Sequence, residues 1–226
     1  MKRVIITGSE GVVGSELTKF FTKKKIKVFK LDKELGHDLT DEKFVKKWFK
    51  ENKADHLVNC FALNDHIDKK INKKSLFNIP LDVVSEYFRI NLTSLFSVCR
   101  EYSKNTKTGS IINFSSYLGI VSSRPDLYEG NHKDIGYCVS KSGVISLTKY
   151  LAAYWNNSGI RVNALTLGGV KNDQNKEFIK KYSSKTMIGR MANDDEFVGI
   201  LLFMSSDVSS YMTGSNVIVD GGWTAW

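Results

Sequence analysis

Short runs rich in valine and isoleucine alternate with amphipathic stretches from one end of this chain to the other. The apolar runs have the length of strands, and several are continuously apolar, as strands buried on both faces of a parallel sheet are. The expected strands cover residues 3–7, 27–31, 56–61, 110–114, 161–166 and 216–219. This alternation predicts an α/β fold: a doubly wound parallel sheet with helices on both faces.

The stretches between the expected strands carry apolar residues at helical spacing. Val13, Leu17, Phe20 and Phe21 lie on one face of a helix that follows the first strand. The stretch from residue 81 to about 103 predicts a long helix. A length of 226 residues, with no linker or repeat, fits one domain over 1–226. Residues 63–79 and 121–136 lack periodicity and are expected to be loops that carry specificity.

The formal net charge of +9 first raises the question of an anionic partner. Lysines are spread along the chain and arginine is scarce, which favours a solvated surface over a nucleic-acid interface. The excess of basic residues could also serve to bind an anionic substrate. No apolar run approaches the length of a membrane span, so no membrane contact is expected.

The cysteines and histidines indicate the redox compartment of the protein and whether a metal site is to be expected. The cysteines are odd in number and form no Cys-x-x-Cys pair, and the chain enters a strand at once, without a signal peptide. We therefore expect reduced thiols and a cytoplasmic protein. The histidines are scattered without ligand spacing, so no metal site is expected. These residues are Cys60, Cys99, Cys138, His37, His56, His66 and His132.

A glycine pattern follows the first expected strand and precedes the first helix. Glycines there let the backbone approach a pyrophosphate at the positive end of the helix, as in Rossmann-like dinucleotide sites. An empty glycine-rich turn is the alternative. The residues expected around the cofactor in this turn are Gly8, Ser9, Glu10, Gly11, Val12, Val13 and Gly14.

Asp32 ends the second expected strand, 24 residues after Gly8. An acidic residue at that spacing accepts hydrogen bonds from the adenosine ribose. Its charge would repel a 2′-phosphate, and Glu10 would add to the repulsion, so NAD is expected rather than NADP, with Lys33 as a possible exception. Asp38, in His37-Asp38-Leu39-Thr40, could contact the adenine, while Asp38 or Thr40 is expected to cap a helix over 41–51.

Lys141 follows Tyr137 by four positions, so the two residues lie on one face of a helix, one turn apart. A free tyrosine has a pKa of about 10, and a neighbouring ammonium lowers the cost of its ionised form. The spacing alone is common, and a surface pair is the alternative. The serine pair Ser115-Ser116 ends the fourth expected strand upstream of it.

With these motifs in order, the chain resembles the single-domain branch of the short-chain dehydrogenase/reductase family. The resemblance covers nearly the whole sequence. Its motifs are the glycine turn, Asp32, Asp38-Leu39, Asn59, Asn91, Ser115-Ser116, Tyr137 with Lys141, Arg161-Val-Asn-Ala and the tail from Ser205-Ser-Asp through Tyr211-Met-Thr-Gly to Val219-Asp-Gly-Gly222.

The resemblance implies a role for each matching residue. Tyr137 is implied as general acid/base, Lys141 as the group that lowers its pKa and binds the nicotinamide ribose, and Ser116 as the holder of the substrate oxygen. Asn91 corresponds to the asparagine that positions a water next to the lysine. The remaining cofactor residues implied in this way are Asp38, Leu39, Asn59, Gly168 and Val170.

Three positions depart from the family pattern. Val12 stands where this branch usually has glycine. The usual Asn-Asn-Ala-Gly is Asn59-Cys-Phe-Ala62, which puts a side chain near the adenosine ribose. The usual Pro-Gly is Leu167-Gly168-Gly169, which lacks the rigid proline.

Two segments are left for the substrate: a substrate loop (121–136) and a flap (170–190) expected to close on bound ligand. The loop is long and polar, with Arg124, Tyr128 and Lys133, which favours a polar, polyhydroxylated or anionic small molecule over a steroid or acyl chain. Tyr128-Glu-Gly and the run from Gly168 resemble a bacterial subgroup from legionaminic-type nonulosonic acid and flagellin-glycan pathways.

The leading hypothesis is a nicotinamide-dependent alcohol/ketone oxidoreductase acting on a sugar or sugar phosphate. The alternatives are a 3-oxoacyl-thioester reductase and a catalytically silent NAD-binding scaffold or sensor. The resemblance also implies a homodimer or homotetramer.

Overall fold

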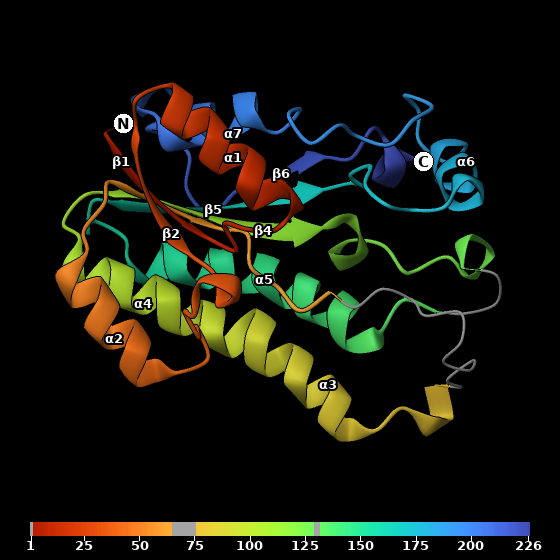
Figure 1. Ribbon diagram of the computed structural model, residues 1–226, viewed down its shortest axis with the longest axis horizontal. Helices are drawn as coiled ribbons and strands as arrows, with labels where there is room; N and C mark the ends of the chain where they lie inside the picture. Colours follow the sequence, from red (N-terminus) through yellow and green to blue (C-terminus); the bar gives the residue numbers. More distant parts are fainter. Residues whose placement is uncertain (1, 65–75, 129–131) are drawn as a thin grey trace.

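The computed structural model describes residues 2–64, 76–128 and 132–226, and these contain one six-stranded parallel sheet (Figure 1). Its strand order is β2-β1-β3-β4-β5-β6. The strands are β1 (Arg3–Thr7), β2 (Lys27–Leu31), β3 (His56–Asn59), β4 (Gly109–Ser116), β5 (Ile160–Leu167) and β6 (Asn216–Val219). The order reverses beside β1, so the prediction of a doubly wound parallel sheet is confirmed.

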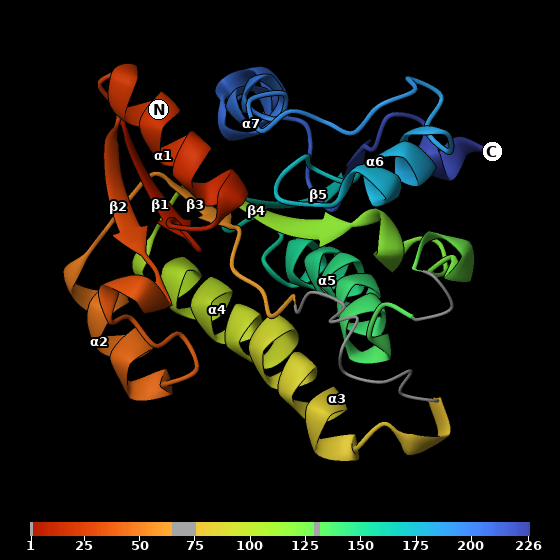
Figure 2. The same cartoon turned by 45° about the vertical axis from the view of Figure 1, so that its right-hand side comes forward.

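Helices cover both faces of the sheet (Figures 1 and 2). One face carries α1 (Val12–Lys23) and α7 (Val198–Ser205). The other carries α2 (Glu42–Glu51), α4 (Leu95–Asn105) and α5 (Ile135–Tyr154). The helix α3 (Leu81–Phe88) continues the line of α4, and α6 (Lys176–Ser183) lies beyond the carboxyl ends of β4 and β5 (Figure 2). No helix in the described ranges is both long and apolar enough to cross a membrane.

The central strands read as continuous apolar runs because each of their side chains meets a helix layer. Ile5 packs into the cluster formed with α2, α4 and α5, whereas Val4 and Ile6 pack into the cluster formed with α1 and α7. All three are fully buried. Alternate residues of a strand point to opposite faces, so one run supplies both cores.

The long helix expected over 81–103 is interrupted. A π-helical turn, Arg89–Ser94, joins α3 to α4. The Ser94 hydroxyl donates to the carbonyl oxygen of Arg89, five residues earlier, at 2.9 Å, in keeping with the wider turn. Such turns insert one extra residue into a helix and are frequent at functional sites. Asn91 lies inside this one and is buried.

The expectation that Asp38 or Thr40 caps the second helix was wrong. The helix begins at Glu42, and its N-cap is Asp41, whose carboxylate accepts from the Lys43 backbone N–H at 2.9 Å. The Asp38 carboxylate instead accepts from both the backbone N–H and the hydroxyl of Thr40, at 2.8 and 2.7 Å. The two aspartates thus form consecutive turns, of which only the second starts the helix.

Candidate active site

A cavity of about 750 Å³ opens at the carboxyl ends of the strands, beside the point where the strand order reverses. Ligands of open α/β sheets bind at this place. The cavity brings together the glycine turn, the ends of β3, β4 and β5, the start of α5, and α6. Of the residues expected from the sequence, it is lined by Gly8, Gly11, Val12, Val13, Gly14, Ser116, Tyr137, Lys141, Gly168 and Val170.

The amino end of α1 is the part of this cavity best suited to a phosphate. Its N-cap is Gly11, which has no side chain to accept from the first backbone N–H groups. The side chains of Asp41, Asp134 and Asn175 cap α2, α5 and α6, whereas α3 and α7, like α1, have no side-chain cap. The unpartnered N–H groups and the helix dipole together form an anion site.

The glycines of the turn are required for different reasons. Gly8 has a φ of +67°, and a Cβ there would lie 2.6 Å from the backbone nitrogen of Phe61. A Cβ on Gly14 would lie 1.9 Å from the carbonyl oxygen of Gly8. Gly11 meets only that oxygen, at an ordinary 3.4 Å. Packing of the chain therefore requires Gly8 and Gly14, and leaves Gly11 open to a ligand.

Asp32 lies beside the glycine turn and holds it. One carboxylate oxygen accepts from the backbone N–H of Glu10 at 2.9 Å, and the other from that of Glu34 at 3.0 Å. Lys30 pairs with Glu10 at 2.7 Å, and this hydrogen bond is the main cause that lowers the pKa of Glu10. Because Lys30 offsets the charge of Glu10, repulsion of a 2′-phosphate depends mainly on Asp32.

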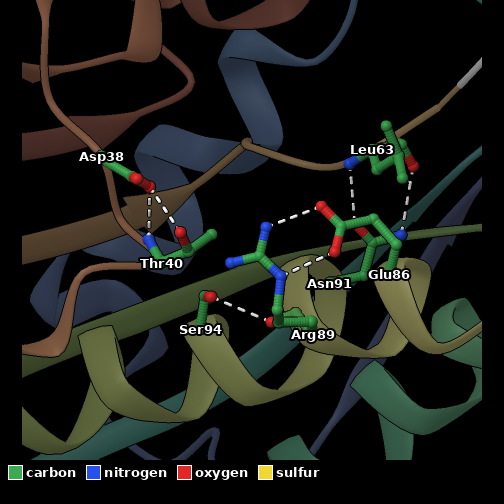
Figure 3. A network of polar contacts seen from close by, with 7 residues as sticks. All are labelled: Asp38, Thr40, Leu63, Glu86, Arg89, Asn91 and Ser94. Carbon is green, nitrogen blue, oxygen red and sulfur yellow. Dashed lines mark hydrogen bonds and ion pairs between the residues drawn. The ribbon is translucent and has the colours of Figure 1, made fainter. Parts of the chain in front are cut away.

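Several expected cofactor residues do not line the cavity. Leu39 belongs to the core, and the Ser9 side chain is buried. Asn59 is also buried, where its amide accepts from the Thr7 hydroxyl at 3.0 Å and donates to Asn113 at 2.9 Å. Asp38 lies near Arg89, and its bonds to Thr40 lower its pKa (Figure 3). In this structure Asn59 ties β1, β3 and β4 together.

Tyr137, Ser116 and Lys141 meet at the centre of the cavity. Burial raises the pKa of Tyr137 to about 12, and a hydrogen bond with the Ser116 hydroxyl opposes that rise. The Lys141 Nζ lies 5.7 Å from the centroid of the Tyr137 ring and donates to the carbonyl oxygen of Phe114 at 2.9 Å. Burial lowers the pKa of Lys141 to about 8. Burial therefore favours the uncharged form of both side chains.

The adjacent serine has a different partner. The Ser115 hydroxyl donates to the backbone carbonyl of Lys141 at 2.8 Å, so it fastens β4 to α5. Ser116 accepts from the backbone N–H of Leu118 at 3.2 Å and contacts Tyr137. Both serines line the cavity, but the Ser115 hydroxyl is engaged with α5, whereas Ser116 contacts Tyr137.

Asn91, in the π-helical turn, connects three segments, and its two hydrogen bonds with Leu63 are drawn in Figure 3. Its side-chain oxygen accepts from the backbone N–H of Leu63 at 2.7 Å, and its amide nitrogen donates to the carbonyl oxygen of Leu63 at 3.1 Å. The same nitrogen donates to the Ser140 hydroxyl at 2.9 Å. Asn91 does not line the cavity, and it holds the segment after β3 against α5, the helix that carries Tyr137.

The substrate loop is less polar on its inner side than its composition predicts. It contributes Leu127, Tyr128 and Lys133 to the cavity wall. Arg124 instead pairs with Asp126 at 3.3 Å, and Asp126 also pairs with Lys185 at 2.8 Å. Residues 129–131 of the loop and 65–75 of the earlier segment lie outside the described residues. Asp126 thus links the loop to the flap through Lys185, whereas Leu127, Tyr128 and Lys133 line the cavity.

An aromatic cluster in the flap region was not expected from the sequence. Tyr182 of α6 stacks on Trp223, with ring centroids 4.5 Å apart and planes at 16°, and meets Tyr117 edge-on at 5.8 Å. The backbone N–H of Gly169 donates to the Tyr182 hydroxyl at 2.5 Å. Tyr182 therefore anchors α6 and fixes the turn that lacks the usual proline. No local pattern marks it, because its partners come from distant segments.

Replacing Tyr182 with phenylalanine keeps the stacked ring but leaves the Gly169 N–H without its partner. We expect the free energy of unfolding to fall by about 1–3 kcal/mol, the cost of an unsatisfied buried donor. Amide exchange at Gly169 should become faster than in the wild type, while Tyr150→Phe, an exposed tyrosine on α5, should change neither quantity. Unchanged exchange at Gly169 would contradict the anchoring role.

Among the described residues, no three His, Cys, Asp or Glu side chains are grouped so that they could hold a metal ion. The cysteines Cys60, Cys99 and Cys138 carry free thiols. The described polar side chains that line the cavity carry hydroxyls, amides and ammonium groups, with one carboxylate, that of the exposed Asp173.

Comparison with known proteins agrees with this geometry. A family model described as enoyl-(acyl carrier protein) reductase matches residues 16–224. An uncharacterized short-chain type dehydrogenase/reductase of Sinorhizobium fredii is 30% identical over 97% of this chain, which spans 43% of that relative. The post-translational flagellin modification protein A of Campylobacter coli is 30% identical over 77% of this chain and 69% of its own.

The structural comparison gives the same result. The crystal structure of a short chain dehydrogenase from Leptospira borgpetersenii with bound NAD+ superposes with a TM-score of 0.88. It is 29% identical, and the match covers 99% of this chain and 92% of that one. This chain belongs to the short-chain dehydrogenase/reductase family.

Proposed function

We propose that this protein is an NAD-dependent oxidoreductase that interconverts a hydroxyl and a ketone on a carbohydrate-like substrate. The observation that carries the proposal is the group of Ser116, Tyr137 and Lys141 in one cavity with the uncapped start of α1. Nicotinamide supplies hydride chemistry when it is bound. Gly11 and the first N–H groups of α1 would hold the pyrophosphate, and Asp32 the adenosine ribose.

The protein's own task is to orient the substrate and move one proton. Ser116 would hold the substrate oxygen, and the Tyr137 hydroxyl would give or take the proton at that oxygen. Burial holds the pKa of Tyr137 at about 12, so the Tyr137 anion needs a positive neighbour. Lys141, one helical turn away, would provide that charge. Asn91 would act as a positioning residue through Ser140 and Leu63.

The rate should depend on pH through the Tyr137–Lys141 pair, which titrates as a unit. Burial lowers the pKa of Lys141 to about 8, so the pair should lose its first proton near that pH. The proton that remains can reside on Lys141, which leaves Tyr137 as the anion beside a positive charge. Oxidation needs the pair to accept a proton, so kcat/KM for oxidation should rise as the pH passes through about 8. In the reduction direction kcat/KM should fall over the same range.

The check on this prediction is a pH profile of wild type and Lys141→Arg. A guanidinium keeps its proton, so the rising limb of the variant should move to higher pH. A profile that is flat through this range, or one that the arginine leaves in place, would contradict the pairing.

The substrate class draws support from the relatives. The D-arabinitol 2-dehydrogenase of Candida tropicalis is 33% identical over 65% of this chain, and a galactitol 2-dehydrogenase of Rhizobium johnstonii is 34% identical over 61%. This chain spans 54% of each. The cavity adds Asn172, Gln174 and Asn175 beside its aromatic walls. Amides and aromatic faces together suit a polyhydroxylated ring or chain.

A 3-oxoacyl-thioester reductase is the second candidate. The 3-oxoacyl-[acyl-carrier-protein] reductase of Chlamydia pneumoniae is 26% identical over 99% of this chain and 97% of its own. The inward-facing Leu127, Phe178 and Met191 would suit an acyl chain. Steady-state assays with NAD(H) and NADP(H) against polyols, sugar phosphates and a 3-oxoacyl thioester would decide between the two. Faster turnover of the thioester would overturn the carbohydrate proposal, and a clear NADPH preference would overturn the role of Asp32.

The proposal also includes the cellular compartment of the protein and its oligomeric state. An odd number of free thiols supports a cytoplasmic protein. On α5, Tyr150 and Tyr154 are 65% and 70% exposed and stack with ring centroids 6.3 Å apart. Two exposed, parallel rings on a helix suit a contact with a second copy. Light scattering should give the mass of a dimer or tetramer, and Tyr150→Lys with Tyr154→Lys should reduce it.

A further inference from the structure

An ion pair lies beside the glycine turn, next to the carboxylate that would hold the adenosine ribose. The Lys30 Nζ lies 2.7 Å from a carboxylate oxygen of Glu10, and the Ser9 hydroxyl donates to the same oxygen at 3.1 Å. The backbone N–H of Glu10 donates to the Asp32 carboxylate at 2.9 Å. Two donors therefore hold the Glu10 side chain, and a third contact holds its backbone against Asp32.

The strand β2 places Lys30 on the same side as the glycine turn. Alternate residues of a strand point to opposite faces. Val28 packs into the core formed with α1 and α7, whereas Phe29 and Leu31 pack into the core formed with α2, α4 and α5. Lys30 and Asp32 therefore share the α1 side of the sheet with Val28. Since β2 is an edge strand and the Lys30 side chain is 39% exposed, a ligand can reach this ammonium.

The charges at this edge bear on the choice between NAD and NADP. Asp32 is the negative group that would repel a 2′-phosphate. Lys30 carries the opposite charge and would attract one, because phosphate oxygens accept charge-assisted hydrogen bonds from ammonium groups. In this structure the Lys30 ammonium is already bound to the Glu10 carboxylate. Glu10 thus holds the position on Lys30 that a phosphate would take.

We propose that Glu10 is a specificity-determining residue for the cofactor, because it occupies the ammonium of Lys30 and keeps it from a 2′-phosphate. The preference for NAD then depends on two carboxylates. Asp32 repels the phosphate, and Glu10 removes the cation that would offset this repulsion. This inference rests on the proposed function, which puts the adenosine ribose at Asp32. Since the 2′-hydroxyl of NAD carries no charge, breaking the pair should change the binding of NAD little.

The test measures the Kd of NADH and of NADPH by fluorescence titration, without any substrate. Wild type should bind NADH more tightly than NADPH. Glu10→Gln keeps the shape of the side chain and removes its charge, so Lys30 becomes available to the phosphate. The Kd of NADPH should then fall about 10-fold, the lower end of the range for a hydrogen bond to a charged group. The Kd of NADH should change by less than about 2-fold.

A double variant assigns the gain to Lys30. When Glu10→Gln is combined with Lys30→Met, the gain in NADPH affinity should vanish, because the released ammonium is absent. If the double variant keeps the gain, another cation binds the phosphate, such as Lys33, which is exposed in the loop after β2, and the inference is wrong.

The matched control is Glu16→Gln, which makes the same change in net charge one turn further along α1, where Glu16 pairs with Lys19. It should leave both Kd values as in wild type. An equal gain in NADPH affinity in this control would show a general effect of net charge and would overturn the inference.

The inference and the proposed function fail on different results. If wild type binds NADH and Glu10→Gln leaves the ratio of the two Kd values unchanged, the inference falls and the proposed function stands. A wild type that prefers NADPH would overturn the role of Asp32 and the inference together. If wild type binds neither nucleotide, the proposed function falls and the inference with it.

Discussion

Replacing Tyr137 with phenylalanine should lower kcat by about 10²- to 10⁴-fold, the range in which a positioned acid or base contributes. The change removes one oxygen and keeps the ring, which is 8% exposed and packs edge-on against Tyr87 at 6.4 Å. Binding of NADH should stay close to that of wild type, because the glycine turn and Lys141 are untouched. Steady-state kinetics together with a fluorescence titration of NADH measures both.

The matched control for this variant is Tyr150→Phe, which alters an exposed tyrosine on the same helix and should leave kcat unchanged. If Tyr137→Phe keeps most of its activity, another group carries the proton and the assignment of Tyr137 is wrong. If NADH binding is lost together with activity, the variant has disturbed the site, and the retained fold must be checked by its thermal midpoint.

The second large effect is expected at Gly14. An alanine Cβ there would lie 1.9 Å from the carbonyl oxygen of Gly8, a backbone atom that cannot move without shifting the turn. Gly14→Ala should reduce the free energy of unfolding by about 2–4 kcal/mol, a large part of the roughly 5–15 kcal/mol of a typical domain. Denaturant unfolding gives this value, and NADH affinity should fall as well because the turn is displaced.

Gly11→Ala is the informative comparison. Its Cβ would be 3.4 Å from the Gly8 oxygen, an ordinary contact, so stability should change by less than about 1 kcal/mol. NADH affinity should nevertheless fall about 10-fold or more, because the methyl group keeps the pyrophosphate from N–H groups worth about 1.5–3 kcal/mol per charged hydrogen bond. Equal stability losses in the two variants would contradict the division between packing and binding in this turn.

The sheet was predictable because its central strands are buried on both faces and therefore stand out as apolar runs. The predicted ends of the strands were less accurate. Ser115 and Ser116 are polar but belong to β4, because α5 buries them and supplies the carbonyl of Lys141 as a partner. The π-helical turn also escaped prediction, since its signal is a single hydroxyl bond from Ser94 to the backbone five residues earlier.

The order of Ser116, Tyr137 and Lys141 along the chain predicted one common site, and the structure brings these residues together in one cavity. In the sequence, Lys133 is only one of the polar residues of the substrate loop. Its closeness to the Tyr137 ring depends on how the loop enters α5, and the order of residues along the chain does not reveal it. Tyr182 is the clearest case. Its anchoring contacts with Gly169, Tyr117 and Trp223 join four segments, and a local pattern cannot show such a meeting.

The most direct test of the central claim is the appearance of NADH absorbance when the enzyme is mixed with NAD+ and a panel of polyols and sugar phosphates. Wild type should form NADH with at least one member, and Tyr137→Phe, saturated with NAD+ as judged by a binding titration, should form almost none. Tight binding of NAD(H) without turnover by wild type on these substrates or on a 3-oxoacyl thioester would instead identify a nucleotide-binding scaffold and contradict the account.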